Sequence, residues 1–130
     1  MKYIIITKKI WSKTNFDSLK KNFLIFNKIN TKKIKSLNPK IIFFIHWSKL
    51  INSSIFNNYT CIQFHASNLP KGRGGSPVQN QILMNKRKTK LSAFKVSKNL
   101  DAGPICLQNN LDLKGNANQV FIQLEKAAVL

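Results

Sequence analysis

Residues 40–46, KIIFFIH, contain the longest uninterrupted apolar run of the chain, Ile41–Ile45. An apolar run that does not alternate with polar residues is typical of a strand covered on both faces, as in parallel sheets. A second strand-like stretch, TCIQFH, follows at residues 60–65. We therefore expect two strands close together in the middle of the chain, the first of them buried.

Strand-like and helix-like segments alternate outward from this run. Further strands are predicted at 3–7, 23–26, 90–97 and within 103–113. Helices are predicted at 15–22, over 31–37 up to the Asn38-Pro39 pair, from Ser76-Pro77 onward, and at 116–130. This order indicates an α/β fold: a Rossmann-like open, mainly parallel sheet flanked by helices, with a strand pair in the C-terminal half.

The length of 130 residues fits one domain, residues 1–130. The last predicted helix reaches Leu130 without a stop signal, so we expect this domain to be cut short at its C-terminus. No apolar run approaches the roughly 20 residues that span a bilayer. Cys61 and Cys106 have neither metal nor redox spacing, and we interpret them as reduced, buried thiols of a cytoplasmic protein.

The chain is strongly basic, with 22 Lys and Arg against 4 Asp and Glu and a net charge of +18. Such a charge is typical of nucleic-acid binding. A compositional drift toward Lys, Asn and Ile would also produce it, because the lysines are spread along the chain. Only Arg73 and Arg87 are arginines, the residue better suited to bidentate phosphate contacts. The charge alone therefore leaves both interpretations open.

A candidate site lies where the 60–65 strand ends. Gln63 and His65 are two residues apart, so they share one face of that strand. Ligands bind outside the carboxyl ends of strands in open α/β sheets, and the next segment, ASNLPKGRGGSP (66–77), is a loop rich in glycine and proline. Asp101, one of the four acids, lies in a second short loop, NLDAGPI (99–105).

Each of these features also has a structural explanation. A histidine at a strand end is often only a packed side chain, and a turn aspartate often bonds its own backbone. The GRGG segment lacks the ending and spacing of a Walker-type phosphate loop. His46 is the only other histidine, and no cysteine or carboxylate spacing supports a metal site.

The two loops together carry a more specific pattern. The motif H-x-S-x-L-P-x-x-R-G-G-x-P begins at His65, and L-D-x-G-P-I places Asp101 36 positions after that histidine. This pairing resembles the formyltransferase N-terminal domain family, whose members include methionyl-tRNA formyltransferases and sugar N-formyltransferases. The resemblance marks as substrate or loop residues Ser67, Pro70, Arg73, Gly74 and Gly75.

The resemblance implies transfer of a formyl group from 10-formyltetrahydrofolate to a primary amine. Gln63, His65 and Asp101 would be catalytic, with Gln63 at the position where the family has asparagine. The folate would lie against two segments made of Phe44, Ile45, His46, Trp47 and Ser48, and of Leu100, Ala102 and Gly103. We expect the acceptor to be an amino sugar on a nucleotide. The alternatives are methionyl-tRNA, or a catalytically idle fragment or basic RNA-binding paralogue.

Overall fold

The structure is a computed structural model that describes residues 3–8, 13–67, 69, 78, 81, 84, 87–98 and 103–113. Its strands within these ranges are β1 (Tyr3–Thr7), β2 (Leu24–Phe26), β3 (Ile41–Ile45), β4 (Thr60–His65), β5 (Lys88–Lys95) and β6 (Ile105–Asp112). Its helices there are α1 (Lys13–Lys20), α2 (Thr31–Leu37) and α3 (Ser53–Phe56). None of these helices is long and apolar enough to cross a membrane.

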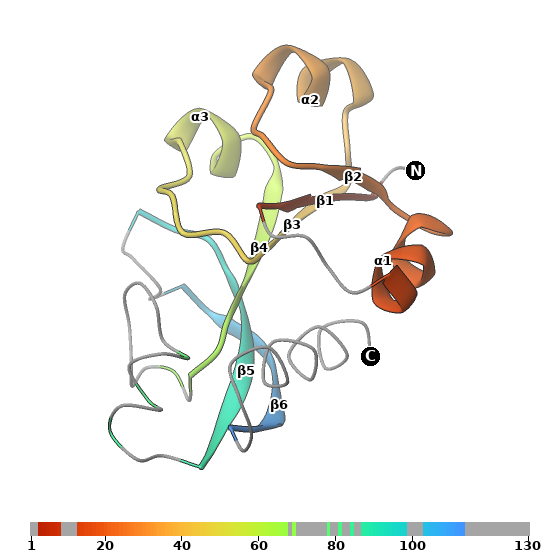
Figure 1. The fold of residues 1–130 in the computed structure, drawn as a ribbon. Coiled ribbons are helices and arrows are strands. Elements are labelled where there is room, and N and C mark those ends of the chain that lie inside the picture. Colours follow the sequence, from red (N-terminus) through yellow and green to blue (C-terminus); the bar gives the residue numbers. More distant parts are fainter. Residues whose placement is uncertain are drawn as a thin grey trace.

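The strands form one sheet in the order β2-β1-β3-β4-β5-β6 (Figure 1). The first four strands of this order are parallel to one another, whereas β5 pairs antiparallel with β4 and β6 pairs antiparallel with β5. The predicted α/β fold with a mainly parallel sheet and a C-terminal strand pair is therefore confirmed. Because β1 to β4 are parallel, their carboxyl ends meet at one edge of the sheet.

The parallel half of the sheet is covered on both faces. On one face, Ile34 of α2 and Ile55 of α3 pack on a cluster that includes Ile42, Phe44 and Cys61. On the other face, α1 contributes Leu19 to a cluster with strand residues Ile5 and Ile45. Two covered faces explain why β3 is continuously apolar rather than alternating.

The end of α2 follows from its sequence. Asn38 adopts a left-handed conformation, with φ of 46°, and its backbone N–H bonds the carbonyl of Ile34 at 2.9 Å. Asparagine tolerates this conformation better than most residues, and Pro39 prevents the helix from continuing. The predicted stop at Asn38-Pro39 is therefore confirmed.

A third cluster holds the antiparallel half together and supports the segment that leaves β4. Ala66 packs there with Leu91 of β5, Leu111 of β6 and Val78, all of them buried. Val78 and Gln81 are helical, as predicted for the segment after Ser76-Pro77. The residues just beyond His65 are thus anchored to the strand pair.

Two features differ from what the sequence predicts, and one predicted helix cannot be compared with the structure. The sequence did not predict α3, because a four-residue helix is too short to show a periodic pattern. Cys61 is buried as predicted, but the prediction for Cys106 is wrong, since this free thiol is exposed on β6. The helix predicted at 116–130 lies outside the described residues.

Candidate active site

Gln63 and His65 lie at the carboxyl end of β4, between β3 and β5. Gln63 is opposite Phe44 in the parallel pairing and opposite Phe94 in the antiparallel one. Strand alternation places Cys61, Gln63 and His65 on one face, the face that α2 and α3 cover nearer the start of β4. Cys61 belongs to the core there, whereas Gln63 and His65 extend toward the carboxyl edge of the sheet.

The side-chain amide of Gln63 reaches the segment that follows β3. Its Nε2 donates a hydrogen bond to the backbone carbonyl of Trp47 at 3.0 Å. An amide NH2 group carries two hydrogens, so this bond occupies one of its two donor positions. Gln63 therefore connects the predicted catalytic strand to the predicted folate segment, a contact that sequence reasoning missed.

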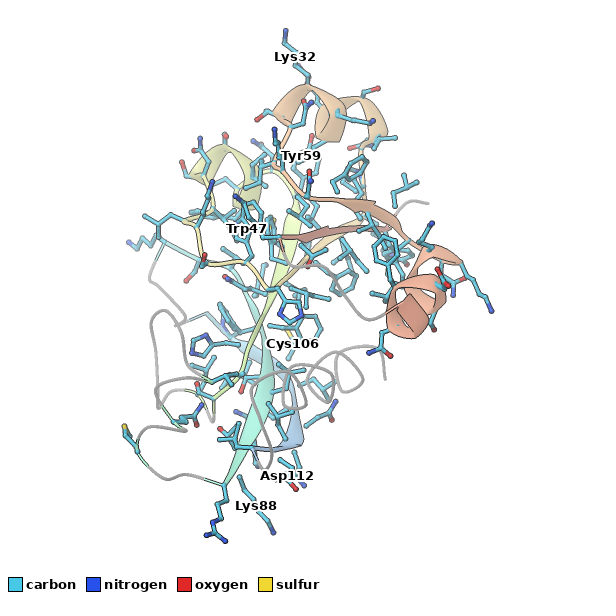
Figure 2. The ribbon with its side chains drawn as sticks, viewed as in Figure 1. Lys32, Trp47, Tyr59, Lys88, Cys106 and Asp112 are labelled. Atoms are coloured by element: carbon cyan, nitrogen blue, oxygen red, sulfur yellow. The ribbon has the colours of Figure 1, made fainter. Side chains whose placement is uncertain are left out.

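The segment predicted to contact folate has one part inside β3 and another part beyond the end of that strand. Phe44 and Ile45 are core residues, with side chains 0% and 2% exposed, so their side chains face the protein interior. His46 has a positive φ of 54° and turns the chain at the strand end. Trp47, labelled in Figure 2, follows and is half-buried. Its ring centroid lies 5.9 Å from that of Phe44, and Ser48 is exposed. Residues 46–48 are therefore the part of the segment beyond the strand.

His65 is buried, with 7% of its surface exposed, and it begins a compact turn. Its carbonyl accepts a hydrogen bond from the N–H of Ser67 at 2.9 Å. The Ser67 carbonyl in turn accepts one from the N–H of Leu69 at 3.0 Å. Ser67, predicted as a substrate or loop residue, is 1% exposed. It therefore lies on the inner side of the turn and helps to hold it in place.

Polar side chains from outside β4 hold the carbonyls of this turn. Ser92 Oγ, on β5, donates to the carbonyl of Ser67 at 2.7 Å. Gln108 Nε2, on β6, donates to Ser92 Oγ at 2.9 Å and to the carbonyl of Leu69 at 3.3 Å. The strand pair therefore fixes the backbone immediately after His65.

A second set of bonds holds the carbonyl of Ala66. Gln81 Nε2 donates to it at 2.6 Å, and Thr89 Oγ1 on β5 donates to Gln81 Oε1 at 2.6 Å. We call Gln81, Thr89, Ser92 and Gln108 the turn clamp. Sequence reasoning missed these residues. The available signal was Ser92 within the apolar run of β5, where a buried hydroxyl needs a partner.

Gly103 marks where the predicted aspartate loop returns to the sheet. It is buried, and a Cβ at this position would lie 1.6 Å from the carbonyl oxygen of Lys95. The neighbouring Pro104 carbonyl accepts a hydrogen bond from the N–H of Lys95 at 2.9 Å. Only glycine, which has no Cβ, allows this close approach. Gly103 therefore lets the backbone pack against Lys95.

The other predicted site residues lie outside the described residues: Pro70, Arg73, Gly74, Gly75, Leu100, Asp101 and Ala102. Among the residues that the structure describes, no group of three His, Cys, Asp or Glu could hold a metal ion. Burial raises the pKa of the Cys61 thiol to about 12, so this neighbour of Gln63 stays protonated and is a poor nucleophile. The polar groups that remain on this face of β4 are an amide and an imidazole.

Comparison with known proteins assigns the family. The family model for formyl transferases matches residues 5–123. A curated methionyl-tRNA formyltransferase from Kosmotoga olearia is 33% identical over 65% of this chain and 28% of its own length. Another, from Thermodesulfovibrio yellowstonii, is 34% identical over 76% of this chain and 32% of its own length.

A solved structure gives the same result. The methionyl-tRNA formyltransferase from Clostridium thermocellum superposes with a TM-score of 0.87 and 37% identity, over 99% of this chain and 61% of that one. The aligned part of this chain thus spans only about a third of the length of the curated relatives named above. The chain belongs to the formyl transferase family.

Proposed function

We propose that this chain carries the formyl-transfer site of a folate-dependent formyltransferase whose acceptor is methionyl-tRNA. The observation that carries the proposal is the position of Gln63 and His65 on one face of β4, at the carboxyl edge of a formyl transferase sheet. Because the chain matches only part of its relatives, their activity is a proposal for this chain rather than a finding.

The formyl donor in this proposal is 10-formyltetrahydrofolate. Residues 46–48 are suited to bind a ring of this donor through hydrogen bonds. Trp47 Nε1 is buried and has no hydrogen-bond partner among the described residues. A buried polar atom of this kind usually has a partner, which a ligand or an ordered water can provide. Gln63 holds the backbone of Trp47, so it would fix this segment against the donor. The bound folate supplies the activated formyl group.

Formyl transfer makes a bond between the amine nitrogen and the formyl carbon and breaks the bond between that carbon and the donor nitrogen. The donor leaves as tetrahydrofolate, whose freed nitrogen takes up one proton from water as the acceptor amine loses one. Negative charge develops on the formyl oxygen before the second bond breaks. His65 and the second N–H of Gln63 are proposed to donate hydrogen bonds to this oxygen. Asp101 is proposed to orient His65 and to receive the amine proton through water. Each donor to such an oxygen contributes about 10²–10³-fold to the rate.

Methionyl-tRNA is the proposed acceptor because the relatives named above at more than 30% identity act on it by name. The net charge of +18 is compatible with a phosphate-rich acceptor. The amino sugar that the sequence analysis favoured has no support from these relatives. Its alternative, methionyl-tRNA, is therefore the better proposal.

The test measures transfer of a labelled formyl group from 10-formyltetrahydrofolate to methionyl-tRNA by the purified chain. We expect turnover by the native chain and a loss of at least about 10²-fold in His65→Ala. Lys40→Gln, an exposed change just before β3, is the control and should keep native turnover. Folate binding is measured on the same samples by tryptophan fluorescence.

Two results would overturn the proposal. No turnover by the native chain, together with unchanged folate binding in His65→Ala, would leave a catalytically idle member of the family. Turnover with an amino sugar nucleotide but not with methionyl-tRNA would keep the chemistry and reject the acceptor.

A further inference from the structure

Two short turns follow His65, and both depend on support from other elements. The N–H of Ser67 bonds the carbonyl of His65 at 2.9 Å, and the N–H of Leu69 bonds the carbonyl of Ser67 at 3.0 Å. Each of these bonds closes a three-residue γ-turn. One hydrogen bond contributes less free energy than the conformational entropy that ordering three residues costs. The segment after β4 therefore needs further contacts to keep one conformation.

The contact nearest to His65 comes from Gln81, whose side chain is buried. Its Nε2 donates a hydrogen bond to the carbonyl of Ala66 at 2.6 Å. That carbonyl belongs to the same peptide group as the N–H of Ser67, which bonds the His65 carbonyl. This peptide group, between Ala66 and Ser67, is thus held at both of its polar atoms. It cannot rotate without breaking both hydrogen bonds.

Thr89 fixes the direction of the Gln81 amide. Its Oγ1 donates to Gln81 Oε1 at 2.6 Å. A carbonyl can only accept, so the amide nitrogen has to face Ala66, and the hydroxyl of Thr89 serves the amide oxygen. Thr89 lies on β5, opposite Leu111 of β6. The hydrogen bonds therefore lead from the strand pair through Gln81 to the peptide group that follows His65.

His65 depends on this peptide group because it is the last residue of β4. Its backbone is held by the sheet on one side, where it is opposite Ser92 of β5. On the other side it is held by the peptide group between Ala66 and Ser67. Ala66 packs in a buried apolar cluster with Val78. A carbonyl without its donor is costly in such surroundings, so the peptide group would turn toward another donor and His65 would move with it.

We propose that Gln81 and Thr89 are positioning residues for the His65 imidazole. Neither side chain donates to the formyl oxygen, and both act through the carbonyl of Ala66. The inference rests on the proposed function, because it takes His65 as a donor to that oxygen. Such donors act at about 2.7–3.1 Å, and a misplacement of about 1 Å can cost about 10²-fold in rate. A rotated peptide group after His65 should therefore lower kcat and leave the affinity for folate unchanged.

The test uses variants that differ in one chemical group. Gln81→Met removes the amide and keeps the length of the side chain. Thr89→Val removes the hydroxyl and keeps the shape, whereas Thr89→Ser keeps the hydroxyl and loses a methyl group. Asn30→Ala is the control, since it removes another bond from a side chain to the backbone, Oδ1 to the N–H of Lys33 at the start of α2. Circular dichroism melting sets a temperature at which all four variants are folded.

The first readout is single-turnover kcat with methionyl-tRNA, together with the Kd for tetrahydrofolate. We expect a loss of about 10- to 10²-fold in kcat for Gln81→Met and Thr89→Val, with native Kd values. Thr89→Ser and Asn30→Ala should keep the native kcat. A native kcat in Gln81→Met would overturn the proposal, as would equal losses in Thr89→Val and Thr89→Ser. A Kd that weakens as much as kcat falls would also overturn it, because the whole site would then be damaged.

The second readout observes the His65 ring directly by NMR and does not need turnover. Its ring signals are identified by their loss in His65→Ala. They should shift or broaden in Gln81→Met and Thr89→Val, and they should stay native in Thr89→Ser and Asn30→Ala. If the native chain has no turnover, the proposed function fails and this measurement still tests the positioning of His65. Native ring signals in Gln81→Met would overturn that role whether or not the chain is active.

Discussion

The Gln63 amide offers the most informative perturbation, because two variants separate its two proposed roles. Gln63→Met keeps the length of the side chain and removes both N–H donors. Gln63→Asn keeps the amide and shortens the side chain by one methylene, so its Nδ2 no longer reaches the Trp47 carbonyl from the 3.0 Å contact that Gln63 makes. Both variants therefore break the contact with Trp47, but only Gln63→Met removes the donor for the formyl oxygen.

The magnitudes follow from the burial of the contact. The bond between Gln63 and Trp47 is partly buried, so its loss should lower the free energy of unfolding by about 1 kcal/mol in either variant. For a chain of this size that corresponds to a fall in Tm of about 3–5 °C. Turnover should differ, with a loss of about 10²–10³-fold in kcat for Gln63→Met and less than about tenfold for Gln63→Asn.

The assay is single-turnover formyl transfer with saturating folate and methionyl-tRNA, combined with thermal unfolding of each variant. Asn58→Ala is the matched control, since it removes another amide-to-carbonyl bond, Nδ2 to the Ser54 carbonyl at 2.6 Å, on the exposed end of α3. It should change the free energy of unfolding by less than about 0.5 kcal/mol and leave kcat unchanged. Equal losses of kcat in Gln63→Met and Gln63→Asn would refute the donor role and leave Gln63 as a positioning residue for Trp47.

Three further predictions follow from the described contacts. Ser92→Ala leaves the buried carbonyl of Ser67 without its hydroxyl donor, and urea unfolding should show a loss of about 1–3 kcal/mol; a loss below about 0.5 kcal/mol would contradict the turn clamp. Gly103→Ala forces a methyl group against a backbone carbonyl and should lower the Tm, whereas a native Tm would show that this contact is absent. A thiol reagent at pH 8 should modify Cys106 in the folded chain and spare Cys61. The pKa of Cys61 in the folded chain is raised to about 12, so its contribution to stability is complete below its unfolded pKa of about 8.5 and falls as pH rises above that value. The free energy of unfolding, measured from about pH 8 to 10, should therefore fall more steeply with pH in the native chain than in Cys61→Ala; equal slopes would contradict this prediction.

The sequence predicts the parallel half of the fold well because its signals are local. The apolar run of β3 and the Asn38-Pro39 stop of α2 depend on near neighbours in the chain. The short helix α3 is stabilised mainly by Ile55 packing on the core, which no periodic pattern reveals in four residues. Exposure of Cys106 depends on which face of β6 the rest of the fold covers, and that is a property of the tertiary structure.

The candidate site was predictable as a strand end with two polar side chains, but its supports were not. The bond from Gln63 to Trp47 depends on the path of the chain after β3, where His46 turns at positive φ. The hydrogen bonds from the turn clamp to the turn after β4 join residues that are 15 to 39 positions apart in sequence. The longest of these separations is that between Gln108 and Leu69. Such contacts form only when the strand pair is in place, so residue types alone do not reveal them.

The most direct test of formyl transfer at β4 is a crystal structure of the chain with a formyl-bearing folate analogue. We expect the formyl oxygen at about 2.7–3.1 Å from both a ring nitrogen of His65 and Nε2 of Gln63, with Asp101 bonded to the other ring nitrogen. The hydrogen bond from Gln63 to Trp47 should persist in this complex. An analogue bound with its formyl group away from the carboxyl end of β4, or a His65 ring that turns away from the formyl group, would contradict formyl transfer at this site.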